Sequence, residues 1–234
     1  MSEADTDAWV RAGLWGLPGY GLLTFFTTLD PQPDPARHYD AWARYVTTDT
    51  YVLAHVLGSA LGLILATFGT VALGAYLART RSGRLAMGSM VMTVVGLLLF
   101  LLGMGVSAFA APMQGQAHLA GLELDDLPES FAGTVQSMVG LVMVVLLFVG
   151  NVLLGVAVWR SRALPRGAGV LWILAAVLMY PLGLVVAAAV TGSTPRTVLV
   201  GTLVVVLAGG WMALAARRGP VRRGAGAPVR HAVT

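Results

Sequence analysis

The chain of 234 residues contains no cysteine and no lysine, and all 15 of its basic residues are arginine. The lack of cysteine excludes disulfides, thiolate metal sites, cysteine nucleophiles and lipid attachment through a thiol. The lack of lysine excludes a catalytic or Schiff-base lysine. Charge is also scarce, because only 11% of the residues are charged, roughly half the share of a soluble domain.

Long apolar blocks without a single acidic residue fill most of the sequence. A helix needs about 20 apolar residues to cross a bilayer core, and helix is the default because the backbone must satisfy its own hydrogen bonds there. We therefore predict an all-α fold, a polytopic transmembrane bundle with one domain over residues 1–218. The six expected spans are residues 12–29, 52–78, 85–111, 131–159, 168–190 and 197–216.

The first block differs from the other five. It contains Pro18 together with Gly16, Gly19 and Gly21, and it has fewer strongly apolar residues. A kinked span, a re-entrant segment and an uncleaved anchor all fit this composition. A bundle of five spans with the N-terminus outside is therefore the alternative to six.

Arginine is distributed in a way that predicts the orientation of the chain. Three arginine-rich segments, at residues 79–84, 160–166 and 217–230, fall on one side if each block spans once. Short arginine-rich loops stay in the cytoplasm, so we expect a cytoplasmic C-terminus and a disordered basic tail over residues 219–234. The composition, rich in Ala, Gly, Val and Arg, is typical of a high-GC bacterial genome, which favours a bacterial inner membrane.

The outer loop of residues 30–50 begins with a proline-rich exit from the membrane. Aromatic residues then recur at helical spacing at Tyr39, Trp42 and Tyr45. Trp and Tyr favour the headgroup level of a bilayer. The spacing predicts a short amphipathic helix on the outer surface, as an aromatic anchor or as a lid over a ligand.

A stripe of small residues runs along the second block. Small residues at a spacing of four form a groove in which another helix can approach closely. The groove suits packing within the chain, and it also suits a homo-oligomer or a membrane-protein partner. Its members are Ala54, Gly58, Gly62, Ala66, Thr70 and Gly74.

A weak internal repeat relates blocks two and three to blocks four and five. The matching residues lie at a constant offset of 81, which would make a parallel repeat of two hairpins. Shared composition and the basic hairpins demanded by topology explain the matches equally well. The matches pair Leu73-Gly74, Arg79, Arg81 and Gly88 with Leu154-Gly155, Arg160, Arg162 and Gly169.

Three histidines, His38, His55 and His118, fall on the predicted outer side near several acidic residues. They permit a metal or haem site, but no two of them share a close helical interval such as i and i+4. We therefore predict no metal and no cofactor. A hydrogen bond from His55 to a neighbouring helix or loop is the simpler expectation.

Three polar residues within the blocks are candidates for a polar lining: Gln136, which the repeat would align with His55, Asn151 and Tyr180. Buried amides usually bond across helices. Pro181 follows Tyr180 and should kink the fifth block, because proline removes a backbone hydrogen bond.

Two segments resemble a known group of proteins. From Tyr51 to Tyr76, an Ala-His pair opens a span rich in Gly and Leu after an outer loop that starts with Asp-Pro. From Ser161 to Gly169, the sequence Ser-Arg-Ala-Leu-Pro-Arg-Gly-Ala-Gly opens the next-to-last span. Together they resemble small uncharacterised multi-pass membrane proteins common in actinobacteria. The resemblance implies a membrane bundle and carries no assigned reaction.

No phosphate-cradling glycine loop, zinc-protease motif or nucleophile elbow occurs in the sequence, so we predict no catalytic residue. The expected partners are the lipid bilayer and a second membrane-protein chain, with no nucleic acid. The leading hypothesis is a non-enzymatic accessory subunit or sensor. One alternative is a carrier of a small apolar or lipid-like molecule with a cavity near Asn151, Gln136 and Pro181; another is a haem or metal redox protein.

Overall fold

A computed structural model of the chain describes residues 3–30, 32–122, 131–186 and 196–218. Within these ranges every regular element is a helix. The predicted basic tail, residues 219–234, lies outside the described residues. The elements are α1 (Glu3–Gly13), α2 (Gly16–Thr27), α3 (Tyr39–Val46), α4 (Asp49–Leu53), η1 (Ala54–Ala60), α5 (Leu61–Ala78), α6 (Gly83–Leu119), α7 (Phe131–Ser161), α8 (Arg166–Met179), η2 (Tyr180–Val186) and α10 (Arg196–Arg218).

Five helices are long and apolar enough to cross a bilayer, which confirms the predicted all-α membrane bundle. They match the last five apolar blocks, with ends that shift by a few residues. The consecutive elements α4, η1 and α5 join into one continuous helix. The five are Asp49–Ala78, Gly83–Leu119, Gly133–Ser161, Arg166–Val186 and Arg196–Arg218.

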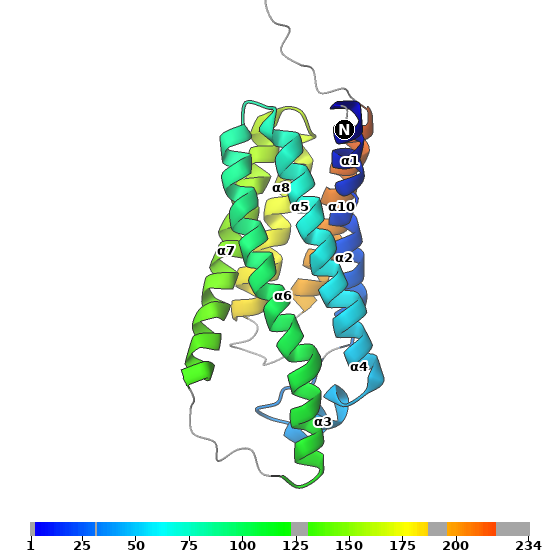
Figure 1. Cartoon of the computed structure of the whole chain (residues 1–234), viewed down its shortest axis with the longest axis vertical. Helices are drawn as coiled ribbons and strands as arrows, with labels where there is room; N and C mark the ends of the chain where they lie inside the picture. Colours follow the sequence, from blue (N-terminus) through cyan, green and yellow to red (C-terminus); the bar gives the residue numbers. More distant parts are fainter. Residues whose placement is uncertain (1–2, 31, 123–130, 187–195, 219–234) are drawn as a thin grey trace, which may run out of the picture.

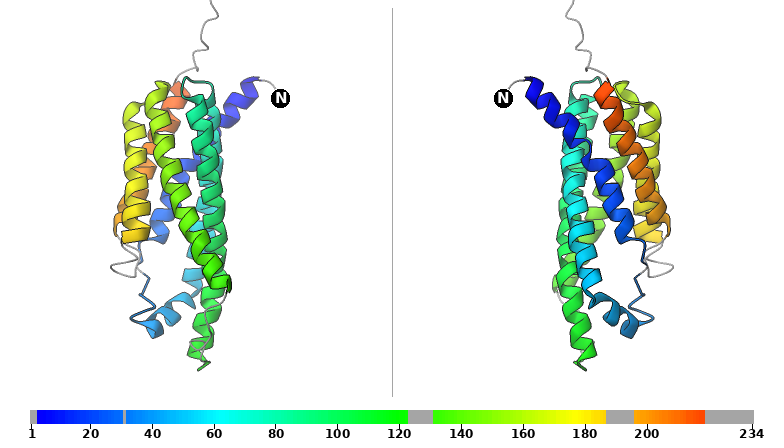
Figure 2. Two further views of the ribbon diagram at one scale, coloured as in Figure 1. Left: turned by 90° about the vertical axis from the view of Figure 1, so that its left-hand side faces the viewer. Right: turned by 90° about the vertical axis from the view of Figure 1, so that its right-hand side faces the viewer.

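The five long helices and α2 stand side by side (Figures 1 and 2), and their contacts close them into a ring. Each consecutive pair packs side by side, from α2 to α5, α6, α7, α8 and α10, and α10 returns to pack against α2. Neighbours in the ring run in opposite directions, because short connections join consecutive helices at alternate ends. The ring therefore has an interior that all six helices can line.

The first apolar block departs from a single helix. It is divided between α1 and α2 by a turn at Leu14 and Trp15. At this turn Trp15 N donates to Ala12 O, three residues earlier, in place of the usual α-helical bond to the residue four earlier. Neither piece alone is long enough to span. Together they run from one end of the bundle to the other, beside α5 and α10 (Figure 2).

The described arginine-rich segments, residues 79–84, 160–166 and 217–218, gather at one end of the bundle, which we call the arginine end (top of Figure 1). It holds the start of α1, the α5–α6 and α7–α8 turns and the end of α10. Arg79 pairs with Asp7, and Arg217 lies over the ring of Trp15 at 4.9 Å. Arg81 Nε donates to the backbone oxygen of Arg160 over 2.6 Å. These contacts fasten α1 and the two turns together.

The opposite end, which we call the α3 end, carries a long extension of α6. The 37 residues of this helix reach roughly 55 Å, well beyond a hydrocarbon core of about 30 Å. The helix therefore continues eight residues past the predicted span of residues 85–111, to Leu119. Gly115 lets α3 approach closely, because a Cβ there would lie 2.9 Å from Ala43 O.

The helix of the outer loop, α3, docks on this extension of α6. Trp42 and Val46 are buried, in a small apolar cluster with Tyr51. The predicted short helix is present, but Trp42 packs against protein and is only 6% exposed.

Two of the helical segments have π geometry, with a widened hydrogen-bond spacing. The first, η1, follows α4, whose start is capped by Thr48 Oγ1 accepting from Tyr51 N. The second, η2, begins at Tyr180, where Pro181 removes a backbone donor. The kink expected at Pro181 is thus accommodated by a π segment. Such segments occur mostly as short bulges inside α-helices and are frequent at functional sites.

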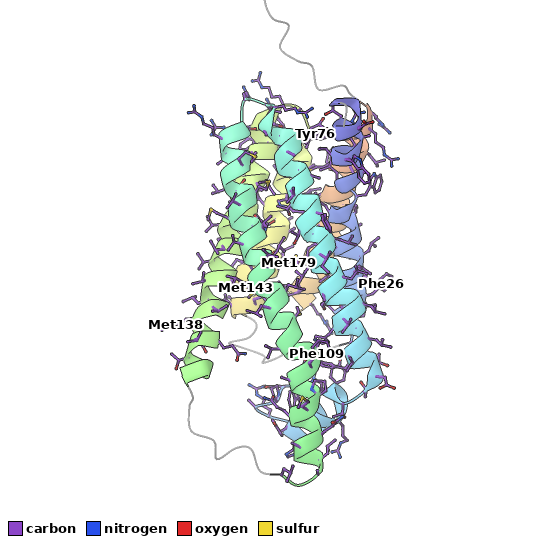
Figure 3. The ribbon with its side chains drawn as sticks, in the orientation of Figure 1. Phe26, Tyr76, Phe109, Met138, Met143 and Met179 are labelled. Carbon is purple, nitrogen blue, oxygen red and sulfur yellow. The ribbon has the colours of Figure 1, made fainter. Side chains whose placement is uncertain are left out.

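The outward faces of the helices are apolar and exposed, as expected of a surface that meets lipid tails. Phe26, Phe109 and Met138 project from three different helices (Figure 3) and are 66%, 62% and 63% exposed. By contrast, the ring interior near the arginine end is filled by fully buried side chains, among them Leu73, Leu77, Leu154, Val158 and Met212.

Candidate functional site

A cavity of about 240 Å³ occupies the ring interior toward the α3 end. Its walls come from α2, η1, α5, α6, α8, η2 and α10, and its mouth reaches the loop after α2. Its polar side chains come mainly from α2, the loop after α2 and η1, and its apolar side chains come mainly from α5, α6, α8, η2 and α10. The lining residues are Tyr20, Thr24, Thr27, Thr28, Asp30, Gln32, Tyr45, His55, Ser59, Leu63, Phe100, Met104, Ser107, Met179, Tyr180, Leu184 and Val198.

Both π segments contribute to this cavity. His55 and Ser59 come from η1, and Tyr180 and Leu184 come from η2. A π segment rotates the following side chains relative to an ordinary helix and leaves the local backbone less regular. The coincidence of both irregular segments at one cavity marks it as the candidate functional site.

Three hydroxyl-bearing side chains lie in the cavity wall where α2 faces η2. Tyr20 is 5% exposed and lies beside Tyr180 and Thr24. Within the described part of the chain, neither Tyr20 Oη nor Thr24 Oγ1 makes a hydrogen bond of ordinary geometry, although both atoms are buried. Buried polar atoms are normally paired, so unpaired hydroxyls in a cavity wall call for an explanation.

His55 is held by two contacts with Tyr51, one turn earlier. Its Nδ1 lies 2.9 Å from Tyr51 O, and the two rings lie 4.0 Å apart between centroids. Tyr51 is itself anchored, because its hydroxyl donates to Ser107 O on α6 over 3.1 Å. The expected hydrogen bond of His55 to a neighbouring segment is therefore made within its own helix.

The mouth of the cavity is bordered by α3 through Tyr45. Its hydroxyl donates to Asp30 O over 3.5 Å, and its ring packs edge-on against Tyr51. Partial burial raises the pKa of Tyr45, and the negative charge of Asp30 adds to the effect. Tyr45 thus remains a neutral hydroxyl at the entrance.

The three outer histidines do not come together. His118 Nε2 lies 2.6 Å from Asp40 Oδ1 and its ring packs edge-on against Tyr39, which fastens α3 to α6. The hydrogen bond and charge of His118 lower the pKa of Asp40, with a smaller effect from Arg44. His38 is exposed, just before α3. Among the described residues, no group of three or more His, Asp or Glu side chains is placed to hold a metal ion.

Of the three predicted polar-lining residues, only Tyr180 lines the cavity. Asn151 is buried between α7 and α8, where its Oδ1 accepts from Trp172 Nε1 over 3.0 Å and its Nδ2 donates to Leu147 O over 2.8 Å. Gln136 is exposed on α7. The described cavity thus reaches the segment of Pro181 through Tyr180, but its lining includes neither Gln136 nor Asn151, whose amide packs α7 against α8.

The small-residue stripe of η1 and α5 faces other helices of the same chain. A Cβ on Gly58 would lie 1.8 Å from Thr27 Cγ2, and one on Gly62 would meet Tyr20 and Thr24 of α2 at 3.5 Å. At the far end, a Cβ on Gly74 would lie 2.3 Å from Met90 Sδ on α6. Ala66 and Thr70 are buried between them, and Ala54 is half-buried.

The proposed repeat has partial structural support. Gly74 and Gly155 both lie where the two helices of a hairpin touch, since a Cβ on Gly155 would lie 2.8 Å from Gly169 O. Gly88, the counterpart of Gly169, has nothing within 4 Å of an added Cβ. The similarity is thus limited to the first helix of each hairpin near its turn.

The cavity residues that the sequence reasoning missed lie mainly on α2 and α6. Tyr20, Thr24 and Thr27 recur at helical spacing in the first block, and that spacing is a signal for one polar face. Ser59 and Ser107 carry no such signal, because single serines are common in membrane helices. Comparison of the chain with models of protein families, with curated proteins and with solved structures gave no match.

Proposed function

We propose that this integral membrane protein binds a small, largely apolar molecule inside its helix ring and acts as a sensor of that molecule. The observation that carries the proposal is the cavity between the two π segments. Cavities for drug-sized ligands span roughly 300–1,000 Å³. A cavity of about 240 Å³ therefore suits a ligand at the small end of that range.

The character of the wall supports a ligand with an apolar body. Phe100, Met104, Met179 and Leu184 supply apolar surface on one part of the wall, and hydroxyl-bearing residues such as Tyr20, Thr24 and Ser59 line the other part. Binding sites for small molecules typically combine apolar walls with a few polar groups that fix the orientation. Such a molecule can enter from the lipid or from the side of the loop at Asp30.

The one-sided position of the cavity favours a sensor over a carrier. Toward the arginine end the interior is closed by side chains such as Leu77, Val158 and Met212, each fully buried. A carrier needs a second conformation in which that end opens. A sensor needs only a ligand-dependent shift of the helices around the cavity.

The test is saturable binding in lipid nanodiscs, with 2-acetyl-6-fluoronaphthalene as the probe and fluorine NMR as the readout. Ser59→Phe places an aromatic ring in the cavity wall. Ser137→Phe makes the same change on the exposed face of α7 and serves as the matched control. We expect saturable binding by the wild type and by Ser137→Phe, and none by Ser59→Phe. Equal, non-saturable partitioning in all three would refute the proposal.

A further inference from the structure

The unpaired hydroxyls of the cavity constrain the chemistry of its ligand, if the proposed binding function holds. Tyr20 and Thr24 lie one helical turn apart on α2 and so share one face. Both hydroxyl oxygens are buried without a hydrogen-bond partner in the described part of the chain. Each can donate a hydrogen bond to a ligand without breaking a bond within the protein.

His55 presents the opposite polarity. A backbone carbonyl only accepts hydrogen bonds, so the contact from Nδ1 to Tyr51 O places the proton of the neutral ring on Nδ1. The one ring nitrogen left to a ligand, Nε2, then carries a lone pair. A ligand carbonyl would be repelled at His55 and attracted by Tyr20 and Thr24, which fixes its direction in the cavity.

The charges around the cavity exclude an ionic ligand. Among the described lining residues there is no arginine, and the one carboxylate, Asp30, lies at the exposed mouth. An anion or a cation held at Tyr20 and Thr24 would find no full counter-charge among the described lining residues inside the cavity. Burial of an unpaired charge in such a site is far more costly than burial of a neutral oxygen.

We propose that the ligand is a neutral molecule whose carbonyl or similar uncharged oxygen accepts hydrogen bonds from Tyr20 and Thr24, while its apolar body packs against Leu63, Phe100 and Met179. The two hydroxyls are then paired only in the bound state. The preference for a ligand oxygen is the property that separates this cavity from a simple apolar pocket.

The test compares 2-acetyl-6-fluoronaphthalene with 2-isopropenyl-6-fluoronaphthalene, in which a methylene replaces the carbonyl oxygen at nearly the same shape. A buried neutral hydrogen bond changes binding by up to about tenfold. We expect the wild-type protein in nanodiscs to bind the ketone about tenfold more tightly than the hydrocarbon. The double variant Tyr20→Phe with Thr24→Val should bind both probes equally, with the hydrocarbon affinity unchanged.

The control is Tyr76→Phe, the same change at a buried tyrosine of α5 outside the cavity, which should keep the tenfold preference. The thermal unfolding temperature of the ligand-free double variant should be at least as high as that of the wild type, because neither lost hydroxyl makes a hydrogen bond of ordinary geometry within the described part of the chain. Saturable but equal binding of the two probes by the wild type would overturn this inference and leave the proposed function standing. A preference that survives in the double variant would also overturn it. Non-saturable partitioning of both probes would refute the proposed function itself.

Discussion

The closure of the helix ring depends on close contact between α2 and α5, and Gly69 is the position that tests it. A Cβ added at Gly69 would lie 2.7 Å from Leu17 Cδ2 and 2.8 Å from the backbone nitrogen of Leu17. Leu17 is fully buried and cannot swing aside. Gly69→Ala should therefore push α2 away from α5 rather than displace one flexible side chain.

The magnitude follows from comparison with a matched glycine. Gly103 lies in the middle of α6, where an added Cβ meets nothing within 4 Å. Replacing glycine by alanine inside a helix gains about 0.5–1 kcal/mol of intrinsic stability, and this gain cancels between the two variants. Overpacking typically costs about 1–3 kcal/mol. Because the contact at Gly69 includes a backbone atom, we expect Gly69→Ala to be about 2–3 kcal/mol less stable than Gly103→Ala.

The assay is unfolding in mixed micelles of mild detergent and SDS, followed by tryptophan fluorescence and far-ultraviolet circular dichroism. Gly103→Ala should unfold at the same SDS fraction as the wild type or above it, and Gly69→Ala clearly below. If the two alanine variants unfold at the same SDS fraction, then Gly69 of α5 does not pack against Leu17 of α2, and the arrangement of the helices as a closed ring is refuted.

Three further predictions concern the α3 end, the α7–α8 contact and the orientation in the membrane. The contact with His118 lowers the pKa of Asp40 below 3.8 in the folded chain, so the part of α3 docking that this exposed pair contributes is lost as the pH falls through the lowered pKa. An acid titration of tryptophan fluorescence should show a partial loosening of α3 only below pH 3.8, and Asp40→Asn should lack this step. Asn151→Leu removes the acceptor of the buried Trp172 N–H and should lower the stability measured by SDS unfolding by about 1–2 kcal/mol. The loss should be smaller in a Trp172→Phe background, and an equal loss in that background would contradict the hydrogen bond. The chain has no native cysteine, so a membrane-impermeant maleimide should label Ala36→Cys in intact cells and Ala163→Cys only after permeabilisation; the reverse order would invert the orientation predicted from the arginines.

Apolar length was sufficient to predict the helices, but it could not place their outer ends. After Ala111 the sequence turns more polar, and hydropathy alone ends the third span there. The structure continues the helix to Leu119, because Gly115 admits α3 against it and His118 pairs with Asp40. This extension depends on a contact with a segment about 70 residues away in the chain, which no local pattern contains.

The candidate site was harder to predict than the fold, for two physical reasons. Tyr20 and Tyr180 meet only because α10 returns to α2 and closes the ring, so their proximity is a property of the topology. The π segments form where the backbone hydrogen bonds change from the α pattern to the wider π pattern. Residues such as Gly58 in η1 are compatible with either pattern, so the sequence does not predict the change. The polar residue that stood out in the sequence, Asn151, instead pairs with Trp172.

The two halves of the ring both contain close glycine contacts, but they differ in how their interiors are filled. Toward the arginine end, Gly69, Gly155 and Gly169 bring backbones into contact, and the interior closes without space for a ligand. Toward the α3 end, Tyr20 and Tyr180 lie in the wall of the cavity, and the two π segments place His55, Ser59 and Leu184 beside it. A ligand that contacts both Tyr20 and η2 would connect α2 to η2 across the cavity. Its binding would then stabilise one spacing of α2 and η2 over others, which is the physical requirement for a sensor.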